Sequence, residues 1–94
     1  MDQKTIVNAQ RVFEELGVQT ILPALGDDVD LHVTLEYSEE TSHAKMMFYH
    51  NANVDLSETA DSLPLLLVQN ASVEVKSVPS EAARYLHCVQ VKLK

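Results

Sequence analysis

Several residue types that would point to a particular function are scarce in this chain of 94 residues. Its one cysteine, Cys88, has no partner within the chain, which excludes a fold held by internal disulfides. Seven lysines and arginines against fourteen aspartates and glutamates leave a net charge of -7, which repels phosphate backbones and anionic lipid surfaces. We therefore expect neither nucleic acid nor a membrane as a partner.

Long hydrophobic runs are also missing from the sequence. The apolar segments are too short to span a bilayer, and the beginning of the chain is too charged for a secretory signal. We expect a cytoplasmic protein, in which the glycosylation pattern Asn70-Ala71-Ser72 would go unmodified. A hydrophobic fraction of 46% is enough for one modest core, so residues 1–94 are predicted to form a single domain.

The first part of the chain has the spacing of an amphipathic helix. Apolar residues recur there at steps of three and four, namely Ile6, Ala9, Val12, Phe13 and Leu16. Gly17 is predicted to end this helix. The apolar segment 18–25 is broken by Pro23, so it is predicted to be either a short strand or a packed loop, followed by turn residues at 26–28.

Alternation of apolar and polar residues predicts two pairs of strands. The first pair is Asp30–Tyr37 and Ala44–His50, joined as an antiparallel hairpin through the polar residues 38–42. The second strand of this pair is apolar on both sides, which predicts a central position in the sheet. The second pair is Ser72–Val78 and Tyr85–Leu93, with a turn at 79–81.

A short helix is predicted between the two strand pairs. Its apolar run is 65–68 and its end lies near Asn70. Asp55 and Glu58 have the spacing of a capping box, but Pro64 is tolerated only in the first helical turn, so Ser62 or Asp61 is the expected N-cap. This order of elements predicts an α+β two-layer sandwich, with an antiparallel or mixed sheet of about four to five strands and two helices packed on one face.

No catalytic motif accompanies these elements. His32 and His50 can approach across the first hairpin and, with a carboxylate, are candidates for zinc, although ordinary histidines on strand faces explain them better. His87 and Cys88 are neighbours on a strand, so their side chains point to opposite faces and the imidazole cannot activate the thiol. Cys88 is expected to be a small core residue, and the sequence favours no enzymatic activity.

The order of segments from Ala44 onward resembles the carboxy-terminal half of the histidine-kinase-like ATPase (GHKL) superfamily. In that superfamily a strand ends in a turn that holds adenine, and a lid, an apolar helix and a final strand pair follow. The corresponding stretches here are 46–55, 63–68 and 72–93. The resemblance implies ATP and magnesium as ligands. The nucleotide-binding residues that it implies are Asn8, His50, Asn51, Asn53 and Asp55.

Two substitutions bear on that implied site. His50 and Ala52 stand where the superfamily has its adenine-binding aspartate and a glycine, so the resemblance implies weak or lost nucleotide binding. Asparagine and aspartate are also ordinary turn and cap residues, and this alternative explains Asn51, Asn53 and Asp55 without a ligand.

Two functions remain open. The first is a small regulatory domain that binds a nucleotide weakly, or has lost it and acts through protein contacts. The second is an acidic interaction module that engages a protein partner, or a second copy in a homodimer, through an exposed strand or an acidic face. The candidate residues of that face are Glu36, Glu39, Glu40, Glu58 and Asp61. An enzyme with a metal or thiol centre is less supported, because no spaced set of ligands is present.

Overall fold

The computed structural model of the chain describes residues 2–27, 29–41, 43–52 and 62–94. One helical segment opens the chain and consists of α1 (Gln3–Val12), the π-helix η1 (Phe13–Ile21) and α2 (Leu22–Leu25). The elements that follow are β1 (His32–Ser38), β2 (His43–His50), α3 (Leu63–Ala71), β3 (Ser72–Pro79) and β4 (His87–Leu93).

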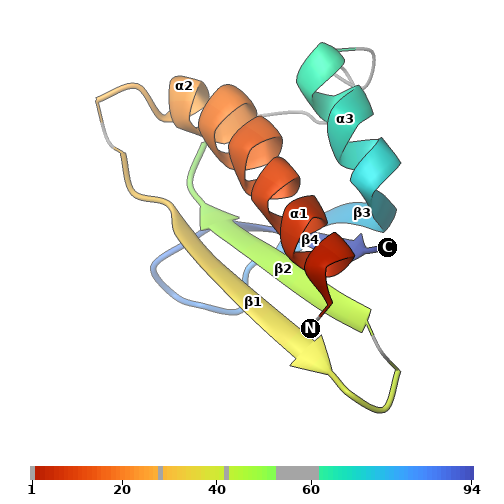
Figure 1. The fold of residues 1–94 in the computed structure, drawn as a ribbon. Helices are drawn as coiled ribbons and strands as arrows, with labels where there is room; N and C mark the ends of the chain where they lie inside the picture. Colours follow the sequence, from red (N-terminus) through yellow and green to blue (C-terminus); the bar gives the residue numbers. More distant parts are fainter. Residues whose placement is uncertain (1, 28, 42, 53–61) are drawn as a thin grey trace.

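The four described strands form one antiparallel sheet in the order β1-β2-β4-β3. Both predicted hairpins are present, and pairing of β2 with β4 joins them, so β2 has the central position that its sequence predicts. Figure 1 shows the first helical segment and α3 on the same face of this sheet. The predicted two-layer α+β fold is therefore confirmed.

The core lies between the sheet and the helices, and the alternation of β2 explains it. Ala44, Met46 and Phe48 are buried, while the residues between them are only half-buried on the other face of the sheet. Residues from β4 and from both helices complete the core, namely Val89, Val91, Leu93, Val12, Leu16, Leu65 and Val68. The face of the sheet that carries no helix is called the open face below.

The prediction that Gly17 ends the first helix is wrong. Helical structure continues to Leu25 and ends at Gly26, whose φ of 63° is a conformation that glycine adopts at little cost. Gly17 instead allows the helix to approach the sheet, since a Cβ at this position would lie 3.3 Å from Cε2 of Phe48. The alternatives of a strand or a loop for 18–25 are both wrong for the same reason.

The helix tolerates Pro23 because of where the proline falls. It lies in the first turn of α2, directly after the wider turns of η1. The hydroxyl of Thr20 donates a hydrogen bond to the carbonyl of Glu15 (2.9 Å), a spacing of five residues that fits a π-helix.

The second helix begins as predicted. Ser62 is the N-cap of α3, its Oγ accepts a hydrogen bond from the backbone N–H of Leu65 (3.4 Å), and Pro64 lies in the first turn. The predicted capping box of Asp55 and Glu58 lies outside the described residues. At the other end, the Ser72 hydroxyl donates to the carbonyl of Val68 (2.7 Å) and leads the chain into β3.

Strand β3 departs from simple alternation at its start. A register irregularity between Ser72 and Glu74 leaves Val73 59% exposed, whereas Val75 packs against the core. The predicted alternation through Val73 and Val75 is therefore interrupted by a bulge.

Candidate functional site

His50, the first residue of the predicted nucleotide turn, is built into the end of β2. It is 2% exposed, and its Nδ1 accepts a hydrogen bond from the backbone N–H of Ala52 (3.1 Å). Burial, followed by the nearby His87 imidazole at a ring distance of 5.4 Å, lowers the pKa of His50. A neutral imidazole therefore stabilises the turn, with one of its two nitrogens already engaged by the backbone.

Asn51, the second residue of that turn, fastens the loop between β3 and β4. Its Oδ1 accepts a hydrogen bond from the backbone N–H of Leu86 (2.7 Å), and its Nδ2 donates to the carbonyl of Arg84 (3.1 Å). Both polar atoms of the amide are thus engaged by backbone groups more than thirty residues away. In this arrangement Asn51 has a structural task that needs no ligand.

Asn8, a further residue of the implied nucleotide site, does not join this pair in the structure. Asn8 lies in α1, nine residues before Gly17, which is the part of the helix that approaches Phe48 in β2. At the rise of an α-helix nine residues span roughly 13 Å along the axis, so Asn8 lies well along the helix from the part that approaches Phe48. Asn53 and Asp55 lie outside the described residues. Nucleotide binding stays a prediction.

The histidines considered for zinc lie on different faces of the sheet. His32 is opposite Tyr49, so its side chain projects from the open face, whereas His50 is opposite His87 on the face that carries the helices. Among the residues that the structure describes, no group of three potential metal-ligating side chains occurs. Cys88 is buried beside Tyr49 on the open face, and burial raises the pKa of its thiol.

A polar cluster at the start of β1 holds the β3–β4 loop in place. Arg84 donates from Nε and Nη2 to Oδ2 of Asp30, both at 2.8 Å, and the Tyr85 hydroxyl donates to Oδ1 at 2.8 Å. The hydrogen bond from Tyr85 and then Arg84 hold the pKa of Asp30 below its usual value, and the same hydrogen bond raises the pKa of Tyr85.

Aromatic rings extend this cluster over the open face. The Tyr85 ring stacks on His32 at 6.3 Å with planes 20° apart, and it lies 6.0 Å from the Tyr49 ring. Sequence reasoning missed the cluster because it placed Asp30 and Tyr85 within strands and because 55 residues separate them. No spacing rule predicts such a contact before the order of the strands is known.

An apolar surface borders β1 on the face that carries the helices. Leu35 and Tyr37 are opposite the core residues Met46 and Ala44, and yet they are 44% and 40% exposed. Strand β1 lies at an edge of the sheet, beside the helical layer and not beneath its middle (Figure 1). These two side chains are therefore only partly covered by the helices.

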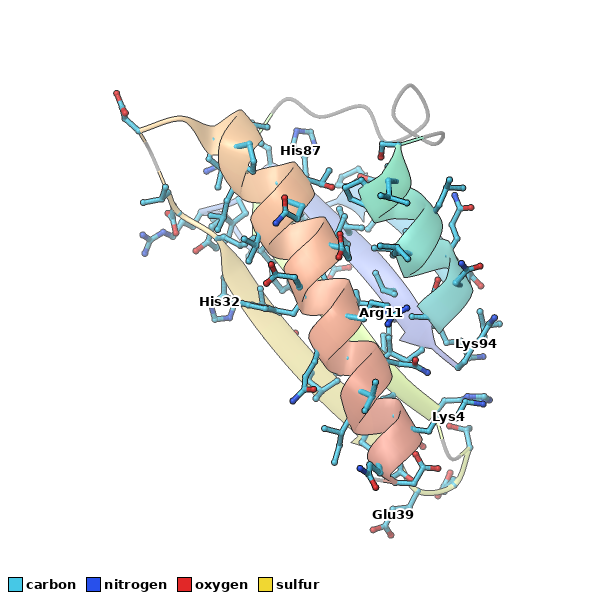
Figure 2. All side chains as sticks on the ribbon, turned by 45° about the horizontal axis from the view of Figure 1, so that its top comes forward. Lys4, Arg11, His32, Glu39, His87 and Lys94 are labelled. Atoms are coloured by element: carbon cyan, nitrogen blue, oxygen red, sulfur yellow. The ribbon has the colours of Figure 1, made fainter. Side chains whose placement is uncertain are left out.

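We infer that two apolar residues of the first helical segment lie on the side of the helix that is turned toward β1. Gly17 lies on the side of the helix that approaches Leu31, which comes just before β1 in the sequence. Phe13 is one turn before Gly17, and Ile6 is two turns before Phe13, so both lie on about the same side of the helix. Figure 2 shows Lys4 and Arg11 leaving α1 on the side away from β1. Ile6 and Phe13 are 43% and 45% exposed. Together with Leu35 and Tyr37 they form what we call the β1 strip.

Comparisons with known proteins return no match: no family model fits the chain, and no curated protein or solved structure is significantly similar to it. In the described part of the chain, no helix has the length and apolar character needed to cross a bilayer. The geometry of the molecule is therefore the basis for a functional proposal.

Proposed function

We propose that this chain is a small protein-binding domain whose β1 edge takes up an extended segment of a partner protein. The observation that carries the proposal is the combination of an edge strand with the apolar β1 strip beside it. A segment that adds as the next strand gains main-chain hydrogen bonds, and every second side chain of that segment can pack on an adjacent apolar surface.

Strand β1 lacks three of the features that usually block the addition of a strand. Its residues, His32–Ser38, include no proline and no lysine, and its register with β2 is continuous over seven pairs. Proteins commonly protect an exposed edge with a proline, a lysine or a bulge, because an unprotected edge pairs with other chains. The absence of these features from β1 is consistent with an edge that pairs with a strand of another protein.

The negative charge near β1 indicates the chemistry of the partner segment. Glu36 lies in β1, and Glu39 and Glu40 follow in the hairpin directly after it, within a chain of net charge -7. A segment in which lysine or arginine alternates with apolar residues complements this edge. A second copy of the chain brings the same negative charge, so the occupant that we propose is a basic strand of another protein.

The proposal corresponds to the form of the regulatory hypothesis in which the domain acts through protein contacts. It is supported by the turn at the end of β2, where Nδ1 of His50 and the amide of Asn51 are occupied by backbone groups of the chain itself. A protein that binds by its sheet edge needs neither of these side chains free for adenine.

Two synthetic strand peptides test the proposal. Both are about eight residues long, like β2 and β3 of this sheet, and alternate valine with either lysine or glutamate. We expect the lysine peptide to bind at least about tenfold more tightly at low salt than the glutamate peptide, with the difference shrinking as salt is added. Calorimetry or fluorescence anisotropy measures both affinities. Equal affinities would contradict the proposed charge complementarity.

Matched variants locate the binding surface. Replacing both Leu35 and Tyr37 with threonine keeps the β propensity of the strand but removes apolar area, and should weaken binding of the lysine peptide by about tenfold. Val73→Thr makes a similar change at the exposed start of β3 and should leave binding unchanged. Equal losses in the two proteins would disprove a site at β1.

Two further measurements separate the alternatives. A molecular mass that rises with protein concentration in the absence of peptide, and that returns to the monomer value when Leu35 and Tyr37 are replaced, would make a second copy the occupant and contradict our choice of partner. A melting temperature raised by ATP with magnesium, and not raised in Asn51→Ala, would instead support nucleotide binding.

A further inference from the structure

A second feature lies on the open face of the sheet and shares Glu36 with the β1 edge. One row of charged residues crosses all four strands in register, in the order Glu36, Lys45, Lys92, Glu74. Lys45 and Lys92 are directly opposite each other on the two central strands. Like charges at directly opposite positions destabilise a sheet, while Glu36 and Glu74, each opposite one of the lysines, offset part of that repulsion.

The two lysines line a hollow in this face. It has a volume of about 430 Å³, and other donors along its wall are Ser38, Thr41, His43, Lys76 and Gln90. A volume of this size lies within the range of small-molecule sites. The hollow is called the lysine groove below.

The local charge of the lysine groove is opposite in sign to that of the chain. Three of the seven basic residues of the chain, Lys45, Lys76 and Lys92, line it together with two glutamates, Glu36 and Glu74. Glu74 pairs with Lys76 at 3.7 Å, while neither Lys45 nor Lys92 forms a salt bridge within the described residues. More distant carboxylates are screened over about 8 Å at physiological ionic strength. The centre of the groove is therefore locally positive.

We propose that the lysine groove binds a small oxyanion, a carboxylate or phosphate group held between Lys45 and Lys92. Each ammonium group has three donors and no acceptor, and the hydroxyl groups of Ser38 and Thr41 can donate to further oxygens of the ligand. An anion between the two lysines reduces their mutual repulsion, and the loss of that repulsion adds to the free energy of binding. The two flanking glutamates disfavour ligands that carry many negative charges.

Inorganic phosphate and citrate are the probes that test this proposal. The melting temperature of the protein is followed while either anion replaces sodium chloride at constant ionic strength. We compare the natural chain, a groove variant with Lys45→Gln and Lys92→Gln, and a control with Lys4→Gln and Lys94→Gln. The control makes the same change of charge at two exposed residues outside the groove. It therefore accounts for the general stabilisation that phosphate gives by exclusion from protein surfaces.

The proposal predicts a saturable rise in melting temperature for the natural chain and for the control. In the groove variant we expect the affinity to fall by at least about tenfold, the loss typical of removing charged hydrogen bonds. A response to phosphate but not to citrate identifies the ligand as a phosphate group, and the reverse response identifies a carboxylate.

The proposal is overturned if the groove variant binds as tightly as the natural chain, or if neither anion gives a saturable response. A second measurement uses the natural chain alone and so does not depend on how the variants fold. In NMR spectra recorded during the titration, the backbone amides of Lys45, Lys92 and their neighbours should shift together with one dissociation constant. Shifts confined to other parts of the surface would also overturn the proposal. Peptide binding at the β1 edge is measured separately, so the two proposals can fail independently.

Discussion

The two edges of this sheet are built in opposite ways. Strand β3 is packed against α3, starts with a bulge between Ser72 and Glu74, ends at Pro79 and carries the exposed salt bridge between Glu74 and Lys76. The bulge, the proline and the charged pair each hinder the pairing of another strand. Strand β1 has a continuous register, no proline and no lysine, and its apolar residues Leu35 and Tyr37 remain partly exposed.

This difference within one small sheet bears on function. If neither edge had a function, we would expect both edges to be protected in the same way against pairing with other chains. The β3 edge shows that a bulge, a proline and charged residues can be accommodated at an edge of this sheet. The β1 edge is therefore the better candidate for an interface, and variants on the β1 side and on the β3 side test the comparison.

The largest expected effect concerns the helix that covers the β3 side. Leu65 in α3 is 4% exposed, so Leu65→Ala should reduce the free energy of unfolding by about 3 kcal/mol, from lost burial and the cavity left behind. Phe13→Ala, on the β1 side, should cost less than about 1.5 kcal/mol, because Phe13 is 45% exposed. Urea denaturation measures both values. Equal losses would mean that the β1 side is as tightly packed as the β3 side.

A smaller effect of opposite sign is expected within β1. The hydroxyl of Thr34 is buried and finds no hydrogen-bond partner among the described residues. Thr34→Val keeps the shape and removes this group, so it should raise the free energy of unfolding by about 1 kcal/mol. Thr34→Ser, which keeps the hydroxyl and loses the methyl group, should not stabilise. A loss of stability in Thr34→Val would show that the hydroxyl has a partner, in water or elsewhere.

The smallest expected effect is pH-dependent and concerns the anchor of β1. The pKa of Asp30 is lowered in the folded state from an ordinary value of 3.8, so its ionised form stabilises the fold. This contribution is complete above that ordinary value and is lost as the pH falls through the lowered folded-state pKa. Asp30→Asn should therefore be less stable than the natural chain near neutral pH, and the difference should shrink in acid. Urea unfolding at a series of pH values measures it.

A control is available for this comparison. Asp27→Asn removes the same charge from the exposed turn just before β1 and leaves the contacts of Asp30 with Arg84 and Tyr85 in place. A stability difference that stays constant with pH in Asp30→Asn would show that the carboxylate does not contribute through its ionisation.

The strands of this fold could be predicted from the sequence because their signal is local. Alternation along Ala44–His50 predicts which residues of β2 share a face and that the strand is central, and the nearby Pro64 predicts Ser62 or Asp61 as the cap of α3, of which Ser62 is the one observed. The length of the first helix could not be predicted. Gly17 and Pro23 usually interrupt helices, and only the approach of the helix to Phe48 explains the glycine.

The candidate sites were less predictable than the fold. His50 and Asn51 lie together simply because they are neighbours in sequence, but the hydrogen bonds of Asn51 depend on a loop more than thirty residues away. The β1 strip combines α1, η1 and β1, and the lysine groove needs the register of three strand pairs. Such sites follow from the order of strands, which the residue pattern alone does not fix.

Amide hydrogen exchange in the presence of the lysine peptide tests the central claim most directly. If the peptide adds to the β1 edge, the outward-pointing amides of β1 should exchange more slowly when the peptide is bound, while exchange along β3 stays the same. Slower exchange along β3, or no change in β1 at saturating peptide, would contradict the account.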